Sequence, residues 1–98
     1  MATMNRFQIV RKRALAPTVT LMEVVAPRVA AKAKAGQFVI VRVDETGERI
    51  PLTVADKDPA RGTITIVFQA VGHTTRQMAA LEEGQQLADV LGPLGQPT

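Results

Sequence analysis

The segment ERIPLTVA, residues 48–55, decides the fold class because its alternating pattern is typical of a two-faced strand. Side chains alternate across a pleated strand, so every second residue shares a face. The apolar face carries Ile50, Leu52 and Val54. The opposite face carries Pro51 and Thr53, and a proline cannot donate a backbone hydrogen bond to a neighbouring strand. We therefore predict an edge, a bulge or a bend at Pro51, with backbone left free for a ligand.

The composition of the 98 residues bounds both the fold and the chemistry. A chain of this length forms one domain with one hydrophobic core. Hydrophobic residues make up 46% of it, and many are valine or isoleucine, so we predict an all-β domain. Cysteine is absent, which excludes disulfides and thiolate-bound metals on these residues and is compatible with a cytoplasmic protein. No apolar run approaches the ~18 residues of a membrane span, so we expect no membrane contact.

The formal net charge of +3 and the sequence pI of about 10.0 raise the question of a polyanionic partner. Three phenylalanines and no tyrosine or tryptophan leave little surface on which bases could stack, which argues against nucleic acid. Residues 11–13, Arg-Lys-Arg, are short for a basic patch, and we interpret them as a solvated strand end. A small phosphorylated ligand or an acidic protein fits the charge better. A non-enzymatic basic β-barrel that binds RNA or a protein stays open as the alternative function.

Alternating apolar residues predict six strands along the chain. They are residues 6–14, 19–26, 37–43, 49–55, 63–71 and 86–91. In the fifth strand Ile64, Ile66, Phe68 and Ala70 share the apolar face, and Val67, Gln69 and Val71 share the other. Residues 28–35 are short for a stable helix, so we expect a turn or a single helical turn there. Residues 56–62 contain two aspartates, but Asp, Pro and Gly together are typical of a hairpin turn rather than of an acid–base or metal site.

One helix is predicted over residues 74–83, just before the last strand. Thr74 and Gln77 have the spacing of a capping box, and Gly84 is suited to end the helix. The first turn of a helix exposes unpaired N–H groups and a partial positive charge, to which Arg76 adds. The start of this helix is therefore a candidate site for a phosphate group.

Four short motifs follow one another in a characteristic order. They are AGQFVI at residues 35–40, GERIPLT at 47–53, GHTT at 72–75 and GPLG at 92–95. With these motifs the chain resembles, over essentially its whole length, the FAD-binding barrel of the ferredoxin–NADP reductase superfamily. The resemblance points to the branch with the flavin subunit of NADH-dependent ferredoxin:NADP oxidoreductase, also described as sulfide dehydrogenase. The electron-transfer subunit of dihydroorotate dehydrogenase is a cousin in that branch.

The resemblance implies a six-stranded antiparallel Greek-key barrel with one short helix before the last strand, and FAD in a groove on its outside. The implied cofactor contacts are Arg49, Ile50, Pro51, Leu52, Thr53, Val67, Phe68, Gln69, Gly72, Thr74 and Thr75. Thr53 would face the N5 edge of the flavin, and Thr74 and Thr75 would meet the pyrophosphate through free N–H groups. Phe68 points inward by its place in the strand, so we expect it in the core unless its backbone makes the contact. No catalytic residue and no metal ligand is implied in this chain.

Two positions depart from the wider superfamily. There, an arginine three residues before the Ser/Thr binds the pyrophosphate, but this chain has Ile50 at that place. Arg49 shares the face of Thr53 and can still take part. The family also stacks an aromatic residue on the flavin where this chain has Pro51 and Leu52, so we expect a more exposed flavin. His73, in a glycine loop, is interpreted as an exposed spacer rather than a proton donor.

Residues 1–98 are therefore expected to form one FAD-binding domain, as a fragment of a longer subunit. The turn-rich residues 92–98 predict a connection to further regions, namely the nicotinamide-binding Rossmann domain and the [2Fe–2S] region that the family has and this sequence lacks. The parent is expected to be an NAD(P)H-dependent flavin oxidoreductase with an iron–sulfur flavoprotein partner subunit. The fragment alone is expected to be inactive, because hydride transfer needs a nicotinamide held against the flavin. A homodimer is one way for it to cover exposed surface.

Overall fold

The computed structural model describes residues 6–34 and 36–96, which contain six strands and two short helices. Their bounds are β1 (Ile9–Ala16), β2 (Val19–Val25), α1 (Pro27–Lys32), β3 (Phe38–Arg42), β4 (Arg49–Asp58), β5 (Thr63–Gln69), α2 (His73–Ala79) and β6 (Asp89–Leu94). The predicted all-β class is confirmed. The predictions that fell on Ala35 and on residues 1–5 and 97–98 lie outside the described residues.

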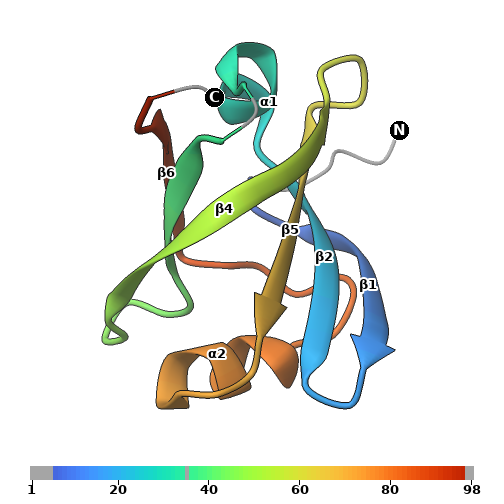
Figure 1. Cartoon of the computed structure of the whole chain (residues 1–98), viewed down its shortest axis with the longest axis vertical. Helices are drawn as coiled ribbons and strands as arrows, with labels where there is room; N and C mark the ends of the chain where they lie inside the picture. Colours follow the sequence, from blue (N-terminus) through green and yellow to red (C-terminus); the bar gives the residue numbers. More distant parts are fainter. Residues whose placement is uncertain (1–5, 35, 97–98) are drawn as a thin grey trace.

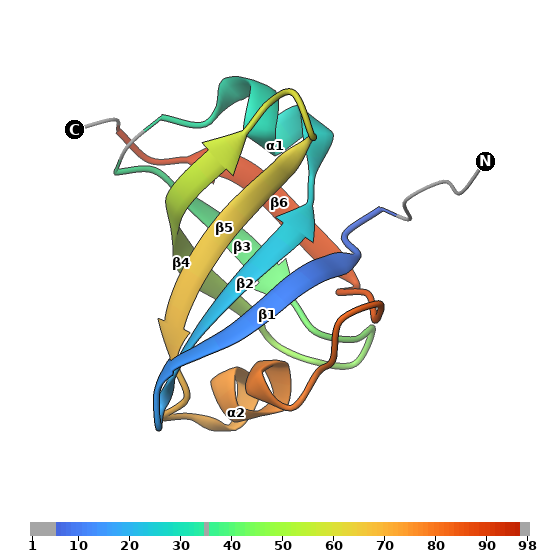
Figure 2. The ribbon, with the colours of Figure 1, turned by 90° about the vertical axis from the view of Figure 1, so that its right-hand side faces the viewer.

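The six strands form one curled antiparallel sheet with the order β1-β2-β5-β4-β3-β6 (Figures 1 and 2). Strands that are not consecutive in sequence pair with each other, as a Greek-key barrel requires. β1 and β6 lie at the two edges, and an isolated antiparallel bridge between Gln8 and Gln86 joins the chain segments that precede them. The Leu87 N–H also donates to the Phe7 carbonyl at 3.0 Å. The sheet is therefore barrel-like, with a bridged seam between β1 and β6 rather than a full strand pair.

The interior of the barrel is apolar, and a helix covers each end (Figures 1 and 2). Met22, Ile64 and Ile66 are among the fully buried side chains that the strands contribute. From α1, Val29 packs into one end, and from α2, Met78 is completely buried at the other. Burial of one such side chain contributes about 1.5–3 kcal/mol, so the helices close the core as well as the ends.

The two-faced character predicted for β4 is confirmed. Ile50 and Leu52 are half-buried against the core and Val54 is buried, whereas Arg49, Pro51, Thr53 and Ala55 are exposed. The pairing of β4 with β5 shifts register between Val54 and Asp56, so an irregularity interrupts the ladder at Ala55. On β5 the predicted alternation also holds, since Ile64, Ile66 and Phe68 are buried.

The last strand differs from the prediction, because β6 covers Asp89–Leu94 instead of residues 86–91. The Gly-Pro-Leu sequence expected to be a turn continues the strand, and Leu94 pairs with Phe38 of β3. Gly92 makes this close approach to β3 feasible. Its φ of 147° suits glycine, and a Cβ there would lie 3.1 Å from the Phe38 carbonyl oxygen.

The helix predicted over residues 74–83 is shorter, since α2 covers His73–Ala79 and begins after Gly72. The predicted capping box of Thr74 and Gln77 is wrong. Instead, the Thr75 hydroxyl accepts a hydrogen bond from the Gly72 N–H at 3.0 Å and so satisfies the backbone before the first turn. At the other end of the barrel, the helical turn expected within residues 28–35 is the short helix α1, which starts on Pro27. No helix in the described part of the chain is long and apolar enough to cross a membrane.

Candidate functional site

β4 and β5 pair along only part of their length, and this leaves an opening in the sheet. Their ladder runs from Asp58 opposite Thr63 to Val54 opposite Ile66. Beyond that point residues 49–53 pair only with β3, and residues 67–69 pair only with β2. The two strands separate as they approach α2 (Figure 1). The opening therefore has two strand edges without a ladder partner, and the start of α2 lies below them.

The divergence explains how Pro51 is accommodated inside the sheet. β4 stands between β3 and β5 in the strand order, and Pro51 is paired with Ile40 of β3. On the other side β5 has already turned away, so no ladder needs the N–H that proline lacks. The predicted edge at Pro51 is confirmed locally, although β4 as a whole is not an edge strand.

The side chains that border the opening are exposed and chemically mixed. Pro51 and Val67 offer apolar surface, and Val67 is 36% exposed. The Thr53 hydroxyl and the Gln69 amide are also exposed. Val71, which is 63% exposed, follows β5 and was not among the predicted contacts. Its alternation with Val67 and Gln69 was the sequence signal that placed it on the same face.

Four of the predicted contact residues face the interior and not the opening. Phe68 and Thr74 are each 4% exposed, and Ile50 and Leu52 are half-buried against the core. The expectation that Phe68 belongs to the core is confirmed. Phe68 and Thr74 are so deeply buried that a ligand in the opening would meet them through their backbone. The predicted residues that present side chains or bare backbone outward are Arg49, Pro51, Thr53, Val67, Gln69 and Gly72.

The start of α2 combines an occupied hydroxyl with free backbone donors. The Thr75 hydroxyl accepts from the N–H groups of Val71 and Gly72, at 3.1 and 3.0 Å. Within residues 6–34 and 36–96, the N–H groups of His73 and Thr74 have no acceptor. Unpaired donors at a helix start favour an anion. His73 itself is exposed, in agreement with its interpretation as a spacer.

Two carboxylates from the β3–β4 connection hold α2 in place, and sequence reasoning missed both. The buried Thr74 hydroxyl donates to Glu48 at 2.6 Å, and the Gln77 amide donates to Asp44 at 3.0 Å. Hydrogen bonds, first of all from the Thr46 hydroxyl, lower the pKa of Asp44 below its ordinary value of 3.8. These contacts bring the beginning of β4 next to the beginning of α2. The partners are 26 and 33 residues apart in the chain, so no local sequence pattern could predict these hydrogen bonds.

Two arginines lie side by side on one face of the sheet at this end of β4, since cross-strand partners share a face. Arg42 lies opposite Arg49 in the β3–β4 register and is bound to Asp89 at 2.7 Å. Arg49 is exposed and makes no ion pair with any described residue. Its cation is therefore available to an anion at the opening, although the Glu48 carboxylate beside it opposes such an anion.

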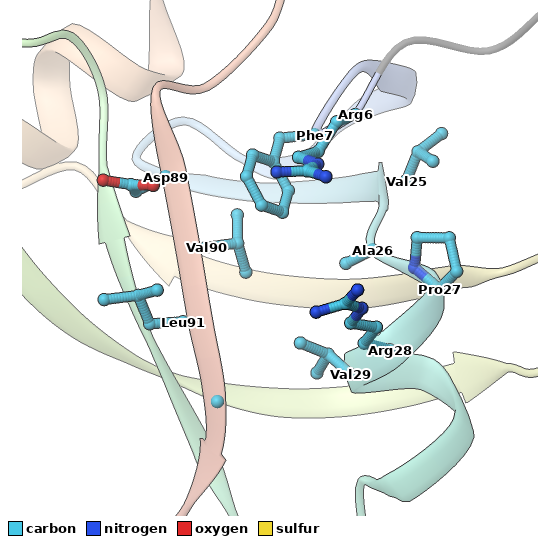
Figure 3. Close-up of a pocket in the computed structure, with 11 residues that line it drawn as sticks. Arg6, Phe7, Val25, Ala26, Pro27, Arg28, Val29, Asp89, Val90 and Leu91 are labelled. Atoms are coloured by element: carbon cyan, nitrogen blue, oxygen red, sulfur yellow. The ribbon is translucent and has the colours of Figure 1, made fainter.

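The hairpin turn predicted over residues 56–62 is shorter in the structure, because β4 continues through Asp58 and only residues 59–62 form the turn. It joins β4 to β5, and the Arg61 N–H donates to the Asp58 carboxylate at 3.2 Å. A separate pocket of about 530 Å³ lies between β6 and the start of α1 (Figure 3). None of the predicted contact residues lines that pocket, and sequence reasoning did not anticipate it.

Comparison with known proteins shows what the chain is similar to. No protein-family profile matches it. A protein of Clostridium beijerinckii described as an uncharacterized protein in the adh 3'region is 54% identical over 92 residues. A Thermotoga maritima homolog of the electron transfer subunit of dihydroorotate dehydrogenase B (NAD(+)) is 44% identical over 91 residues. The solved structure of an NADH-dependent reduced ferredoxin-NADP oxidoreductase covers the whole chain with a TM-score of 0.97 and 42% identity. The chain has the ferredoxin reductase-like fold.

The resemblance predicted from the four motifs is therefore confirmed. The ferredoxin reductase-like chain also shares its fold with the cytochrome b5 reductase domain of Ulva prolifera nitrate reductase, at a TM-score of 0.72 and 20% identity. It spans about a third of the length of the relatives it matches, with 31% of the first and 32% of the second covered. It covers 36% of the oxidoreductase chain. These matches support a flavin-linked reductase over a basic RNA-binding barrel.

Proposed function

We propose that this chain is the FAD-binding domain of an NAD(P)H-linked oxidoreductase. In this proposal the whole protein passes electrons between a nicotinamide nucleotide and an iron–sulfur or ferredoxin-type partner. The support comes from the relatives, which are named as electron transfer subunits and as a ferredoxin-NADP oxidoreductase. The observation that carries it for this chain is the opening between β4 and β5, because the outward residues of both strands and the start of α2 border the same space.

The residues at the opening fit the two chemically different halves of FAD. A flat ring system needs apolar surface with a few polar groups, and Pro51, Val67 and Val71 supply that surface. The Thr53 hydroxyl, on the same face as Pro51, can hydrogen-bond at the N5 edge of the flavin. Bound FAD would supply the capacity to accept a hydride and to release electrons one at a time.

The pyrophosphate half would lie where α2 begins. The unpaired N–H groups of His73 and Thr74 can donate to phosphate oxygens, and Gly72 lets the backbone approach closely. Thr75 would act indirectly. Its hydroxyl accepts hydrogen bonds from the Val71 and Gly72 N–H groups, and this fixes the direction of the next N–H groups in the chain. Arg49, at the near end of β4, adds a cation. Glu48 positions the helix through Thr74, at the cost of a negative charge close to the phosphates.

The remaining functions belong to other parts of a longer protein. We propose a nicotinamide-binding Rossmann domain, a [2Fe–2S] region and an iron–sulfur flavoprotein partner subunit. The support is that the chain spans about a third of its relatives. The task of these 98 residues would be to bind and orient the flavin and to shield one face from water.

The test is FAD uptake by the purified chain, measured as flavin fluorescence quenching and as flavin retained on gel filtration. Thr53→Ala should weaken FAD binding about threefold to tenfold, since one hydrogen bond is worth about 0.5–1.5 kcal/mol. Thr75→Ala should weaken it as well, and a thermal melt of that variant separates loss of the cap from loss of the fold. His73→Ala is the matched control and should bind FAD as the parent does. Absence of any uptake, or loss confined to His73→Ala, would refute the assignment.

A further inference from the structure

The seam between β6 and α1 contains a pocket distinct from the β4–β5 opening (Figure 3). One wall is the edge strand β6 from Asp89 to Gly92, and the other is the β2–α1 junction from Val25 to Val29. The bridge between Gln8 and Gln86 closes the barrel on one side of this seam. The volume of about 530 Å³ lies within the range of small-molecule sites, which is roughly 300–1,000 Å³.

The floor of this seam pocket is apolar. Ala26, Val29 and Val90 are almost completely buried there, and Phe7 is half-buried against the core. Leu91 belongs to the same strand wall through its backbone, but its side chain, which is 48% exposed, points away from the pocket (Figure 3), as its alternation with Val90 requires. A ligand with an apolar body would remove the exposed parts of Phe7 and Pro27 from water and gain about 25 cal/mol per Å² buried.

Two guanidinium groups without a carboxylate partner stand over that floor. Arg6 lies in the turn before β1, with its guanidinium carbon 5.8 Å from the centre of the Phe7 ring, and Arg28 comes from the first turn of α1. Figure 3 shows both side chains entering the space between β6 and α1. Neither forms an ion pair with a residue among 6–34 and 36–96. Asp89, the carboxylate in the lining, is already bound to Arg42 at 2.7 Å.

We propose that the seam pocket binds a small amphipathic anion, with its carboxylate or phosphate between Arg6 and Arg28 and its apolar body on Phe7, Pro27 and Val90. A guanidinium binds a carboxylate or a phosphate through paired hydrogen bonds. The two arginines therefore favour a ligand with an anionic head group. The apolar floor favours a ligand whose remaining part is apolar. The proposal is independent of FAD, because no lining residue belongs to the β4–β5 opening.

The experiment is an amide NMR titration of the chain with octanoate, octyl phosphate and octanol, which share one alkyl body. Octanoate or octyl phosphate should shift the amides of Arg28, Val29, Val90 and Leu91, and the stronger of the two identifies the head group. Octanol should bind at least about tenfold more weakly, since a charge-assisted hydrogen bond is worth a factor of this order. Equal binding of octanol, or shifts confined to residues outside the seam, would overturn the proposal.

Variants separate a charge effect from a loss of fold. Arg28→Gln and Arg6→Gln should each weaken octanoate binding about tenfold. Arg13→Gln, an exposed arginine outside the pocket, is the matched control and should bind like the parent. All three variants should take up FAD unchanged, so failure here and failure of the flavin proposal are distinguishable. A concentration-dependent dimer that excludes octanoate would show that a second copy fills the seam, and would contradict the proposal.

Discussion

The two gaps in this sheet have different origins and different linings. At the β4–β5 opening two strands begin as partners and separate, so both edges stay fixed by their other neighbours, β3 and β2. At the seam, β1 and β6 are the sheet edges, and one isolated bridge and a few hydrogen bonds join the segments beside them. The first gap presents outward-facing side chains and a helix start, whereas the second exposes part of the core below two arginines. The opening therefore presents strand edges and a helix start, whereas the seam is a pocket over the core. We propose FAD for the opening and a compact anion for the seam.

The largest expected effect comes from loosening α2, which borders the opening and is remote from the seam. This change tests whether the two sites are independent. Met78→Ala removes a completely buried side chain and should lower the free energy of unfolding by about 2–5 kcal/mol. Chemical denaturation measures that loss. Below the unfolding transition, the variant should lose FAD affinity and keep octanoate affinity. Equal loss at both sites would mean that the two gaps are mechanically coupled.

The contact between α2 and β4 gives a second, smaller test. Thr74→Val keeps the shape of the buried side chain and removes the 2.6 Å hydrogen bond to Glu48. We expect a loss of stability of about 1 kcal/mol, together with weaker FAD binding from a misplaced helix start. Denaturation and FAD titration measure the two effects.

Glu48→Gln is the companion to that variant, since it keeps an acceptor for Thr74 and removes the negative charge. Stability should stay close to that of the parent, and FAD should bind about twofold more tightly, because surface charge effects are commonly within 1 kcal/mol. Weaker FAD binding in Glu48→Gln would contradict the placement of the pyrophosphate beside this carboxylate.

The smallest expected effect is the pH dependence contributed by Asp44. Its pKa is lowered in the folded chain, chiefly by the Thr46 hydroxyl, so folding favours the charged form. The stabilisation is present above the unfolded pKa, near the ordinary 3.8, and is lost as pH falls through the lowered folded pKa. Thermal melts between pH 5 and about pH 2 should fall less steeply for Asp44→Asn than for the parent. An identical fall would show that Asp44 does not contribute.

The sequence predicted the faces of the strands better than their ends. Alternation alone assigned Thr53 and Val67 outward and Phe68 inward, because the period of a strand is fixed by its covalent geometry. The extension of β6 through Gly92 was missed, since glycine and proline usually mark a turn. Here Gly92 instead permits close contact with β3, which depends on a partner strand more than 50 residues away in the chain.

Only part of the candidate site could be predicted, because the rest of it depends on contacts between residues that are far apart in the chain. Residues on the two strands could be assigned to one face, but the separation of β4 from β5 depends on pairing with β3 and β2. The roles of Glu48 and Asp44 were missed because each holds a residue of α2 across the fold. The seam pocket was missed too, since it joins residues from the beginning, the first third and the end of the chain.

The most direct test of the central claim is an amide NMR titration of the labelled chain with FAD. If FAD binds at the β4–β5 opening, shifts should concentrate on the residues that border the opening and the start of α2, namely Thr53, Val67, Gln69, Gly72 and His73. The amides of Arg28 and Val90, in the seam, should not move. Shifts at the seam in place of the opening, or no shifts with FAD in excess, would contradict it.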